Sequence, residues 1–260
     1  MTAIQTAISL SKIQQHYYKY KALNDYSVDM LTTGMVYFNK ADEFNDPYEL
    51  QLEDSGSYTK NDVINYFMNN DADKMSPTDA TNLANSICAQ YPNIGDFAKK
   101  TLEGVKLHQR DKAGIFCVAK SSRNLLMWAH YADSHKGFAL EIDVSKLDDR
   151  FFPYKVDYAQ NIPKMEYLKS KSDFLKKWAL TKSDHWKYEE EHRMIIPDCS
   201  KIRKFQFPKD SFTKVFWGLN VDIAQRDKIM SQMKANGFNT QFYQEKLNQQ
   251  NYQIIFDPIP

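Results

Sequence analysis

The segment 186–197 constrains the fold more than any other part of the chain. Three consecutive glutamates at 189–191 stand between an aromatic pair and the apolar run 194–196. As a helix, the segment would make Glu189 and Arg193 an i,i+4 surface pair worth about 0.2–0.5 kcal/mol. Tyrosine and isoleucine favour a strand, and Pro197 would end it. We therefore predict that the segment is extended.

In a strand, successive side chains point to opposite faces of the sheet. The carboxylates of Glu189 and Glu191 would then share one face with the guanidinium of Arg193. Charged groups on a buried strand are costly to desolvate, so this arrangement suggests a functional site. The structural alternative is a buried Glu–Arg network that only holds the strand in register.

Composition sets limits on the class of protein. The chain has 260 residues, enough for one large domain or two small ones, and 42% of them are hydrophobic, enough for a real core. With 34 basic and 33 acidic residues, the charge provides no general attraction to nucleic acid or to anionic membranes. Three widely spaced cysteines form no disulfide framework, which favours a reducing cytoplasm. No run approaches the roughly 18 apolar residues of a membrane span, so no membrane contact is expected.

Strand and helix signals are interleaved, without the regular alternation of a doubly wound sheet. They predict an α+β fold with a bent or split, mostly antiparallel sheet. Strands are expected at 17–20, 35–38, 114–118, 137–143, 152–158, 205–207, 215–218 and around Phe242 and Ile254. Helices are expected after Asn24 or Asp25 up to Gly34, at 125–131, as a basic amphipathic helix at 164–180, and at about 221–235.

The stretch of about 59–110 has a different character. Thr59 with Asp62, and Ser76 with Asp79, have the spacing of helix starts, and apolar residues follow at helical intervals. We predict one α+β domain over 1–260 with a helical insertion at about 59–110. The insertion is either a packing subdomain or a lid or partner surface.

Most familiar catalytic motifs are missing from the sequence. The histidines and cysteines show no HExxH or CxxC spacing, so no metal site is predicted. A P-loop, a GxGxxG loop and a G-x-S-x-G elbow are also missing. A glutamate on a rigid strand suits the cleavage of an N-glycosidic bond, because it stabilises positive charge that develops on the sugar.

Several motifs together resemble a widespread bacterial family, domain-of-unknown-function family 2971. The resemblance covers nearly the whole chain outside the helical insertion. It is carried by 18–20, Gly34, 37–38, 44–47, 125–133, 136–137, 141–143, Trp186, 188–189, Glu191, Arg193 and 216–218. The opening order of strand, helix, glycine and strand resembles, more distantly, the start of ADP-ribosyltransferases, including toxins that modify DNA.

That second resemblance implies roles for three catalytic candidates. Glu191 would hold the nicotinamide ribose of NAD and stabilise the oxocarbenium-like transition state. Glu189 would orient or deprotonate the acceptor. Lys19 stands where those enzymes have histidine or arginine, and with Tyr18 it would contact the nicotinamide, ribose or phosphates.

The resemblance also implies a binding set around the catalytic residues. Tyr37 would stack on the nicotinamide, and Arg193 would pair with a glutamate or bind a phosphate. His130 would be placed to transfer a proton, although its helix also has a core face through Met127 and Tyr131. The binding candidates are Tyr18, Tyr20, Tyr37, Asn45, Asp46, Met127, Trp128, His130, Tyr131 and Arg193. For Asn45 and Asp46 the alternative is a plain turn before Pro47.

The expected function is therefore an NAD-consuming, ADP-ribosyltransferase-like protein. It would act as a toxin or phage-defence effector on nucleic acid or protein, with an antitoxin or defence-system partner. A non-catalytic module that binds a nucleotide or a partner is the alternative from another class. A metal-dependent nuclease is a third.

Overall fold

The computed structural model describes residues 2–69 and 75–260. The chain divides into two compact units. Unit 1 comprises Met1–Lys40, Ala113–Val156 and His185–Pro260, and unit 2 comprises Ala41–Lys112 and Asp157–Asp184. None of the helices in the described ranges has the length and apolar composition needed to cross a bilayer.

Unit 1 contains a large mixed sheet with the strand order β14-β13-β12-β5-β1-β4-β10-β6. Within it, β12 and β13 are parallel, and every other pairing is antiparallel. The prediction of a mixed fold with a mostly antiparallel sheet is confirmed. The strands are β1 (His16–Lys21), β4 (Gly114–Ala119), β5 (Phe138–Asp143), β6 (Tyr154–Lys155), β10 (Glu191–Ile196), β12 (Phe212–Trp217), β13 (Gln241–Leu247) and β14 (Ile254–Ile259).

The sheet is weakly joined at its centre. β1 pairs with β5 over six residue pairs and β10 with β4 over six, but β1 and β4 share the single pair Tyr18↔Ala119. Further along β4, Ile115 exchanges backbone hydrogen bonds with Asn39 instead. Between these two points the Nζ of Lys19 donates to the carbonyl of Cys117 at 2.6 Å. A lysine side chain thus takes the place of a ladder bond where the strands diverge.

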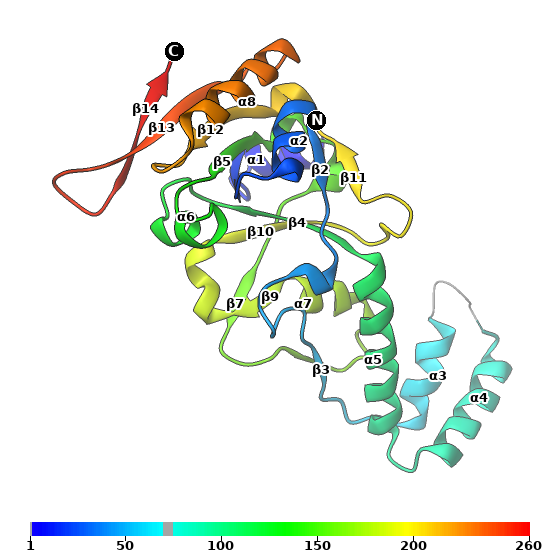
Figure 1. Ribbon diagram of the computed structural model, residues 1–260. Helices are drawn as coiled ribbons and strands as arrows, with labels where there is room; N and C mark the ends of the chain where they lie inside the picture. Colours follow the sequence, from blue (N-terminus) through cyan, green and yellow to red (C-terminus); the bar gives the residue numbers. More distant parts are fainter. Residues whose placement is uncertain (1, 70–74) are drawn as a thin grey trace. The chain divides into compact units, whose positions relative to one another are not determined.

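Helices cover both faces of this sheet. On one face, α1 (Ala3–Ser9), α2 (Asp25–Thr33) and α8 (Ile223–Ala235) bury apolar side chains against the strands. α2 and α8 lie side by side there (Figure 1). On the other face, α6 (Leu125–Tyr131) buries Met127 and Trp128 against β1, β4 and β5.

Local signals at helix ends are confirmed. The side chain of Asn24 accepts from the N–H of Ser27, and α2 ends at Gly34 with φ +81°, a conformation that glycine adopts without a Cβ clash. Asn124 caps α6 in the same way. β2 (Met35–Tyr37) follows α2 and pairs with β11 (Lys204–Gln206) in a separate two-stranded sheet.

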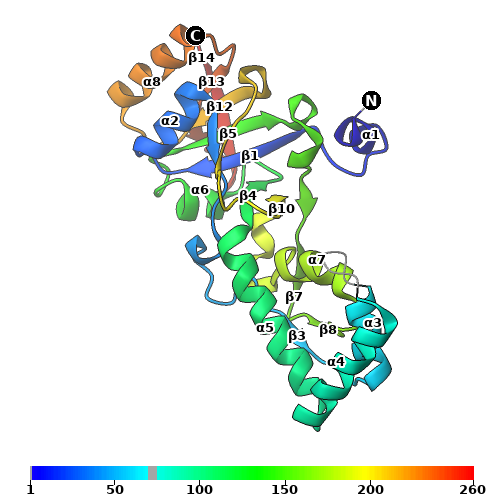
Figure 2. The same ribbon diagram turned by 90° about the vertical axis from the view of Figure 1, so that its right-hand side faces the viewer.

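Unit 2 is rich in helices. α3 begins after the cap residue Thr59, and α4 begins after the cap residue Ser76, as the sequence predicted. Residues 70–74 of the predicted insertion lie outside the described residues. Figure 2 shows the three longer helices of this unit together. Its elements are α3 (Lys60–Met68), α4 (Pro77–Gln90), α5 (Ile94–Lys112), α7 (Phe174–Ala179), β3 (Glu53–Asp54), β7 (Asp157–Ala159), β8 (Lys164–Met165) and β9 (Thr181–Ser183), with short 3-10 turns.

The predicted helix at 164–180 is wrong in most of its length. Lys164 and Met165 form β8, which pairs with β3, and only Phe174–Ala179 is α-helical. Phe174 and Trp178, four residues apart, are buried and stacked on each other. The helical spacing of apolar residues is correct only for that one turn. Earlier in the segment, the pairing of β8 with β3 overrides the local helix propensity.

The predicted strand at the glutamate-rich segment is confirmed only from Glu191 onward. Asp184–Glu189 forms a 3-10 helix, η5, and Glu190 has φ +44°, so the backbone turns before β10 begins. Glu191 and Arg193 do share a face of β10, as expected. Glu189 does not belong to that strand, because the left-handed residue between them interrupts the alternation.

Candidate functional site

One transverse row of side chains crosses the junction of the sheet. Register pairs Glu141 with Tyr18, Tyr18 with Ala119, and Ala119 with Glu191, on four successive strands. Paired residues project from the same face of a sheet, so these side chains form one line on the α6 face. Ala119 has the smallest side chain of the row and lies between Tyr18 and Glu191. The registers, not the sequence spacing, bring these residues together.

At one end of the row Glu191 is held by a guanidinium. The Nε of Arg193 lies 2.9 Å from Oε1 of Glu191, and Nη2 donates to Oε2 at 3.2 Å. Arg193 is 0% exposed and Glu191 is 4% exposed. A two-pronged contact of this kind fixes the carboxylate in direction as well as in charge. It is the Glu–Arg network that the sequence suggested as the structural alternative.

At the other end, Glu141 collects three donors. Its carboxylate accepts from the hydroxyls of Tyr18 at 2.9 Å and Thr213 at 2.8 Å, and Lys214 Nζ lies 3.0 Å away. Burial raises the pKa of Glu141, but these hydrogen bonds outweigh it and hold the pKa below its usual value. Burial, followed by the charge of Glu141, raises the pKa of Tyr18. Tyr18 is therefore a neutral hydroxyl donor.

Lys19 belongs to the opposite face of β1 from Tyr18, because neighbouring residues of a strand alternate. Its Nζ lies 4.6 Å from the centre of the Phe116 ring and donates to the Cys117 carbonyl. Burial, with help from Lys21, lowers the pKa of Lys19 to about 8, against the opposing charges of Glu191 and Glu189. The charges of both carboxylates thus act on the Lys19 ammonium, although Lys19 and Tyr18 lie on opposite faces of β1.

Two contacts link α6 to the segment before β10. Tyr131 donates its hydroxyl proton to Oε1 of Glu189 at 2.5 Å, and His130 Nδ1 lies 2.8 Å from the hydroxyl of Tyr188. The cap residue Asn124 also donates from Nδ2 to the Tyr188 carbonyl at 2.5 Å. α6 thus contacts the segment before β10 through His130 and Tyr131, at Tyr188 and Glu189.

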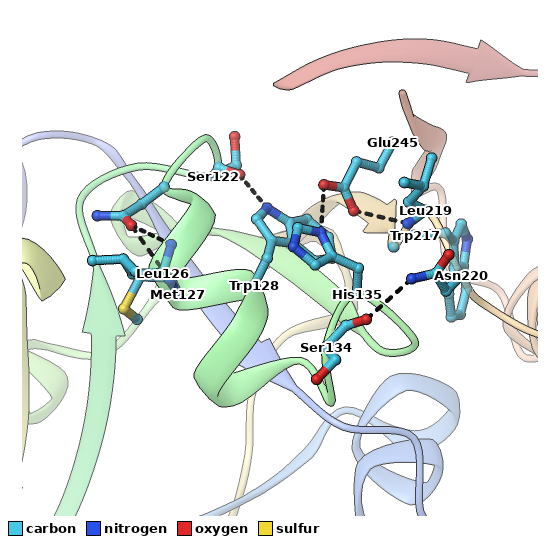
Figure 3. Close-up of polar contacts among 12 residues, drawn as sticks. Ser122, Leu126, Met127, Trp128, Ser134, His135, Trp217, Leu219, Asn220 and Glu245 are labelled. Atoms are coloured by element: carbon cyan, nitrogen blue, oxygen red, sulfur yellow. Dashed lines mark hydrogen bonds and ion pairs between the residues drawn. The ribbon is translucent and has the colours of Figure 1, made fainter. Parts of the chain in front are cut away.

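Other candidates from the sequence serve packing. Trp128 is 0% exposed, and its Nε1 donates to the Ser122 carbonyl at 2.8 Å (Figure 3). Tyr20 meets Trp128 edge-on, and its hydroxyl donates to the Ser121 carbonyl at 2.7 Å. Met127 is buried in the same apolar cluster. Met127 and Trp128 thus pack α6 against Tyr20 and the sheet.

The remaining candidates lie on other elements. Tyr37 is on β2, in the small sheet with β11, and is 37% exposed. Asn45 and Asp46 belong to unit 2, where Asp46 Oδ1 accepts from the N–H of Tyr48 at 2.9 Å in a turn. The second carboxylate oxygen of Asp46 is buried without a partner in the described part of the chain.

Sequence reasoning missed two acidic residues of unit 1. The sequence marks Glu141 only as part of the motif 141–143, and no motif includes Glu245. Both side chains are buried. Alternation gave a weak signal for Glu141, since it interrupts the apolar strand Phe138–Asp143. No local signal marks Glu245, whose partner His135 is 110 residues away.

Comparisons with known proteins give one result. Residues 127–194 match the family model described as "Protein of unknown function (DUF2971)", which supports the resemblance to that family. No curated protein and no solved structure matches the chain. Within the residues that the structure describes, no group of three or more His, Cys, Asp or Glu side chains is arranged to hold a metal ion.

Proposed function

We propose that unit 1 is an NAD-dependent ADP-ribosyltransferase-like enzyme with Glu191 as its central carboxylate. One observation carries the proposal: Glu191 is buried beside the weakly joined centre of the sheet, in one row with Tyr18. A carboxylate held there by Arg193 has the fixed direction needed to stabilise positive charge on a ribose carbon.

The neighbouring groups fit the remaining steps. Glu189 lies on the segment before β10 and His130 lies on α6, and each is hydrogen-bonded to a tyrosine hydroxyl of the other element. Either is a chemically suitable acceptor for the proton that an acceptor hydroxyl or amine loses. Lys19, on the opposite face of β1, adds a positive charge that the carboxylates of Glu191 and Glu189 favour.

A second candidate is a nucleotide- or partner-binding module without chemistry. The Glu191–Arg193 ion pair favours it, because a carboxylate that already accepts two guanidinium bonds is less available to a ribose hydroxyl. The transferase requires that Arg193 share the carboxylate with the substrate. The binding module requires no such exchange.

Nicotinamide release from labelled NAD distinguishes the transferase from the binding module. The transferase predicts release by the intact protein, together with transfer of label to an added nucleic acid or protein acceptor. Glu191→Gln should lower the rate by about 10²–10³-fold, the usual loss for one preorganised electrostatic group. Glu190→Gln is the matched control, because Glu190 is exposed and adjacent.

Two results would decide against the transferase. The first is NAD-induced thermal stabilisation without nicotinamide release, which supports the binding module. The second is equal turnover by Glu191→Gln and Glu190→Gln, which removes Glu191 from the chemistry. Circular dichroism of both variants should match the parent protein, so that a loss of activity is not a loss of fold.

A further inference from the structure

The loop after α6 has an unusual backbone. Asp133, Ser134 and His135 follow one another with φ values of +47°, +51° and +67°. Each non-glycine residue in the left-handed region costs on the order of 1 kcal/mol, and such strain gathers at functional sites. Three in a row persist only where the surroundings impose them.

The surroundings here are the residues after β12. The N–H of Asn220 donates to the carbonyl of His135 at 2.8 Å, and its Nδ2 donates to the carbonyl of Ser134 at 3.2 Å. A Cβ at Gly218 would lie 2.1 Å from the same His135 carbonyl oxygen, so the backbones approach more closely than a side chain permits. The loop is therefore held in one conformation.

The His135 ring is fixed as firmly as its backbone. It stacks on the Trp128 indole with 9° between the planes and 5.9 Å between the centroids. Its Nδ1 lies 2.7 Å from Oε1 of Glu245, a contact visible in Figure 3. Glu245 is 0% exposed, and its Oε2 accepts from the N–H of Leu219 at 2.8 Å.

The carboxylate determines which ring nitrogen carries the proton. With one proton shared by the pair, a neutral imidazole donates from Nδ1 to the ionised carboxylate, and Nε2 keeps its lone pair. Burial raises the pKa of Glu245, while the Leu219 N–H and His135 oppose that rise. This is the arrangement by which a carboxylate orients a histidine base.

Nε2 is available for chemistry. In the described part of the chain, Nε2 has no hydrogen-bond partner. Some buried side-chain nitrogen and oxygen atoms there also lack a partner, but Nε2 is not among them. Because the His135 side chain is 19% exposed, solvent can reach the ring. No side-chain hydroxyl or thiol of the described residues contacts this nitrogen, so the proton it accepts must come from an external molecule.

The pair is separate from the Glu191 site. β13, which carries Glu245, is five strands from β10 in the sheet order. At about 4.8 Å per strand this places the two glutamates roughly 24 Å apart along the sheet. His135 and Glu191 therefore cannot act on the same atom of one substrate.

We propose that His135 is the general base of a second reactive site in unit 1, with Glu245 as its positioning residue. Its substrate is a small hydroxyl-bearing nucleophile, water included, that reaches Nε2 from solvent. In the step, the O–H bond breaks, an N–H bond forms at Nε2, and the oxygen keeps the electron pair. The resulting imidazolium is neutralised by Glu245.

The tautomer can be observed directly. Long-range ¹H–¹⁵N NMR of the whole protein at about pH 8 should show Nδ1 protonated and Nε2 bare. In Glu245→Gln the amide oxygen has to accept from Leu219, so the NH₂ group faces Nδ1 and moves the ring proton to Nε2. A proton on Nε2 in the parent protein, or no change in the variant, overturns the proposal.

Reactivity is the second readout. Hydrolysis of 4-nitrophenyl acetate, a probe ester with water as nucleophile, should fall on the order of 10²-fold in His135→Gln and in Glu245→Gln. His108→Gln is the matched control, because His108 is exposed on α5, and it should react at the parent rate. Hydrolysis that His135→Gln leaves unchanged, even with reduced stability, would make the pair a structural clamp only.

Discussion

Arg193→Met isolates the energetic role of the ion pair at the centre of the sheet. Methionine keeps most of the apolar length of arginine but removes the guanidinium. The variant leaves the carboxylate of Glu191, which is 4% exposed, without the two hydrogen bonds at 2.9 and 3.2 Å that it receives from Arg193. The change therefore tests the cost of an uncompensated charge more than a loss of volume.

The magnitude follows from burial. Breaking a buried ion pair by removing one partner costs about 3–5 kcal/mol. Lys19 is close enough for Glu191 to raise its pKa, so part of the lost positive charge is replaced. We therefore expect Arg193→Met to lower the free energy of unfolding by about 3 kcal/mol, at the lower end of that range.

Equilibrium urea unfolding, followed by tryptophan fluorescence, measures this loss. The double variant Glu191→Gln/Arg193→Met should be more stable than Arg193→Met alone, because no buried charge is left without a partner. Lys204→Met is the control, since Lys204 and Asp29 form a pair 3.9 Å apart with side chains 56% and 45% exposed. An exposed pair of that kind contributes about 0–1 kcal/mol.

The reasoning fails if Arg193→Met unfolds within about 1 kcal/mol of the parent protein, as an exposed pair would. It also fails if the double variant is less stable than Arg193→Met. That result would mean that the Glu191 carboxylate keeps its stabilising contacts after Arg193 is removed.

Three further variants test other parts of unit 1 and unit 2. Gly218→Ala should lower the melting temperature, because its Cβ would lie 2.1 Å from the His135 carbonyl, at a cost of about 1–3 kcal/mol. Gly104→Ala, in α5, where the new Cβ would meet no described atom within 4 Å beyond its chain neighbours and the helix backbone, should instead gain about 0.5–1 kcal/mol. The Lys19 pKa is lowered from 10.5 to about 8, so between those values the unfolded chain binds more protons and stability rises with pH. Lys19→Met should abolish that rise in urea titrations across the window, and a rise of the same size in the variant would assign it to another group.

Local features of the fold were predictable from sequence. The caps at Asn24, Thr59, Ser76 and Asn124 involve backbone groups two or three residues away, so residue type and spacing are sufficient to find them. The strand β10 was equally predictable from its apolar run. Met194 and Ile195, at successive positions of this strand, are both buried. In each case the interaction is made within a few residues of the chain.

Errors arose from a distant strand partner and from local backbone geometry. Lys164 and Met165 have helical neighbours in sequence, yet they pair with β3 across more than a hundred residues. Glu189 is not part of the predicted strand because Glu190 adopts φ +44°, a conformation that no sequence signal at this position predicts. Lys19 is also on the opposite face of β1 from Tyr18, although the two are adjacent in the motif that suggested a shared site.

By itself, the sequence determined the helix caps and the placing of Glu191 and Arg193 on one face of a strand, because alternation along an extended chain requires the latter. Only the tertiary structure decided which carboxylates meet which donors. The register between β5, β1, β4 and β10 aligned Glu141, Tyr18 and Glu191. The packing of the loop after α6 brought His135 to Glu245. Strand register and loop packing depend on the shape of the whole core, and that shape cannot be derived from the spacing of residues along the chain.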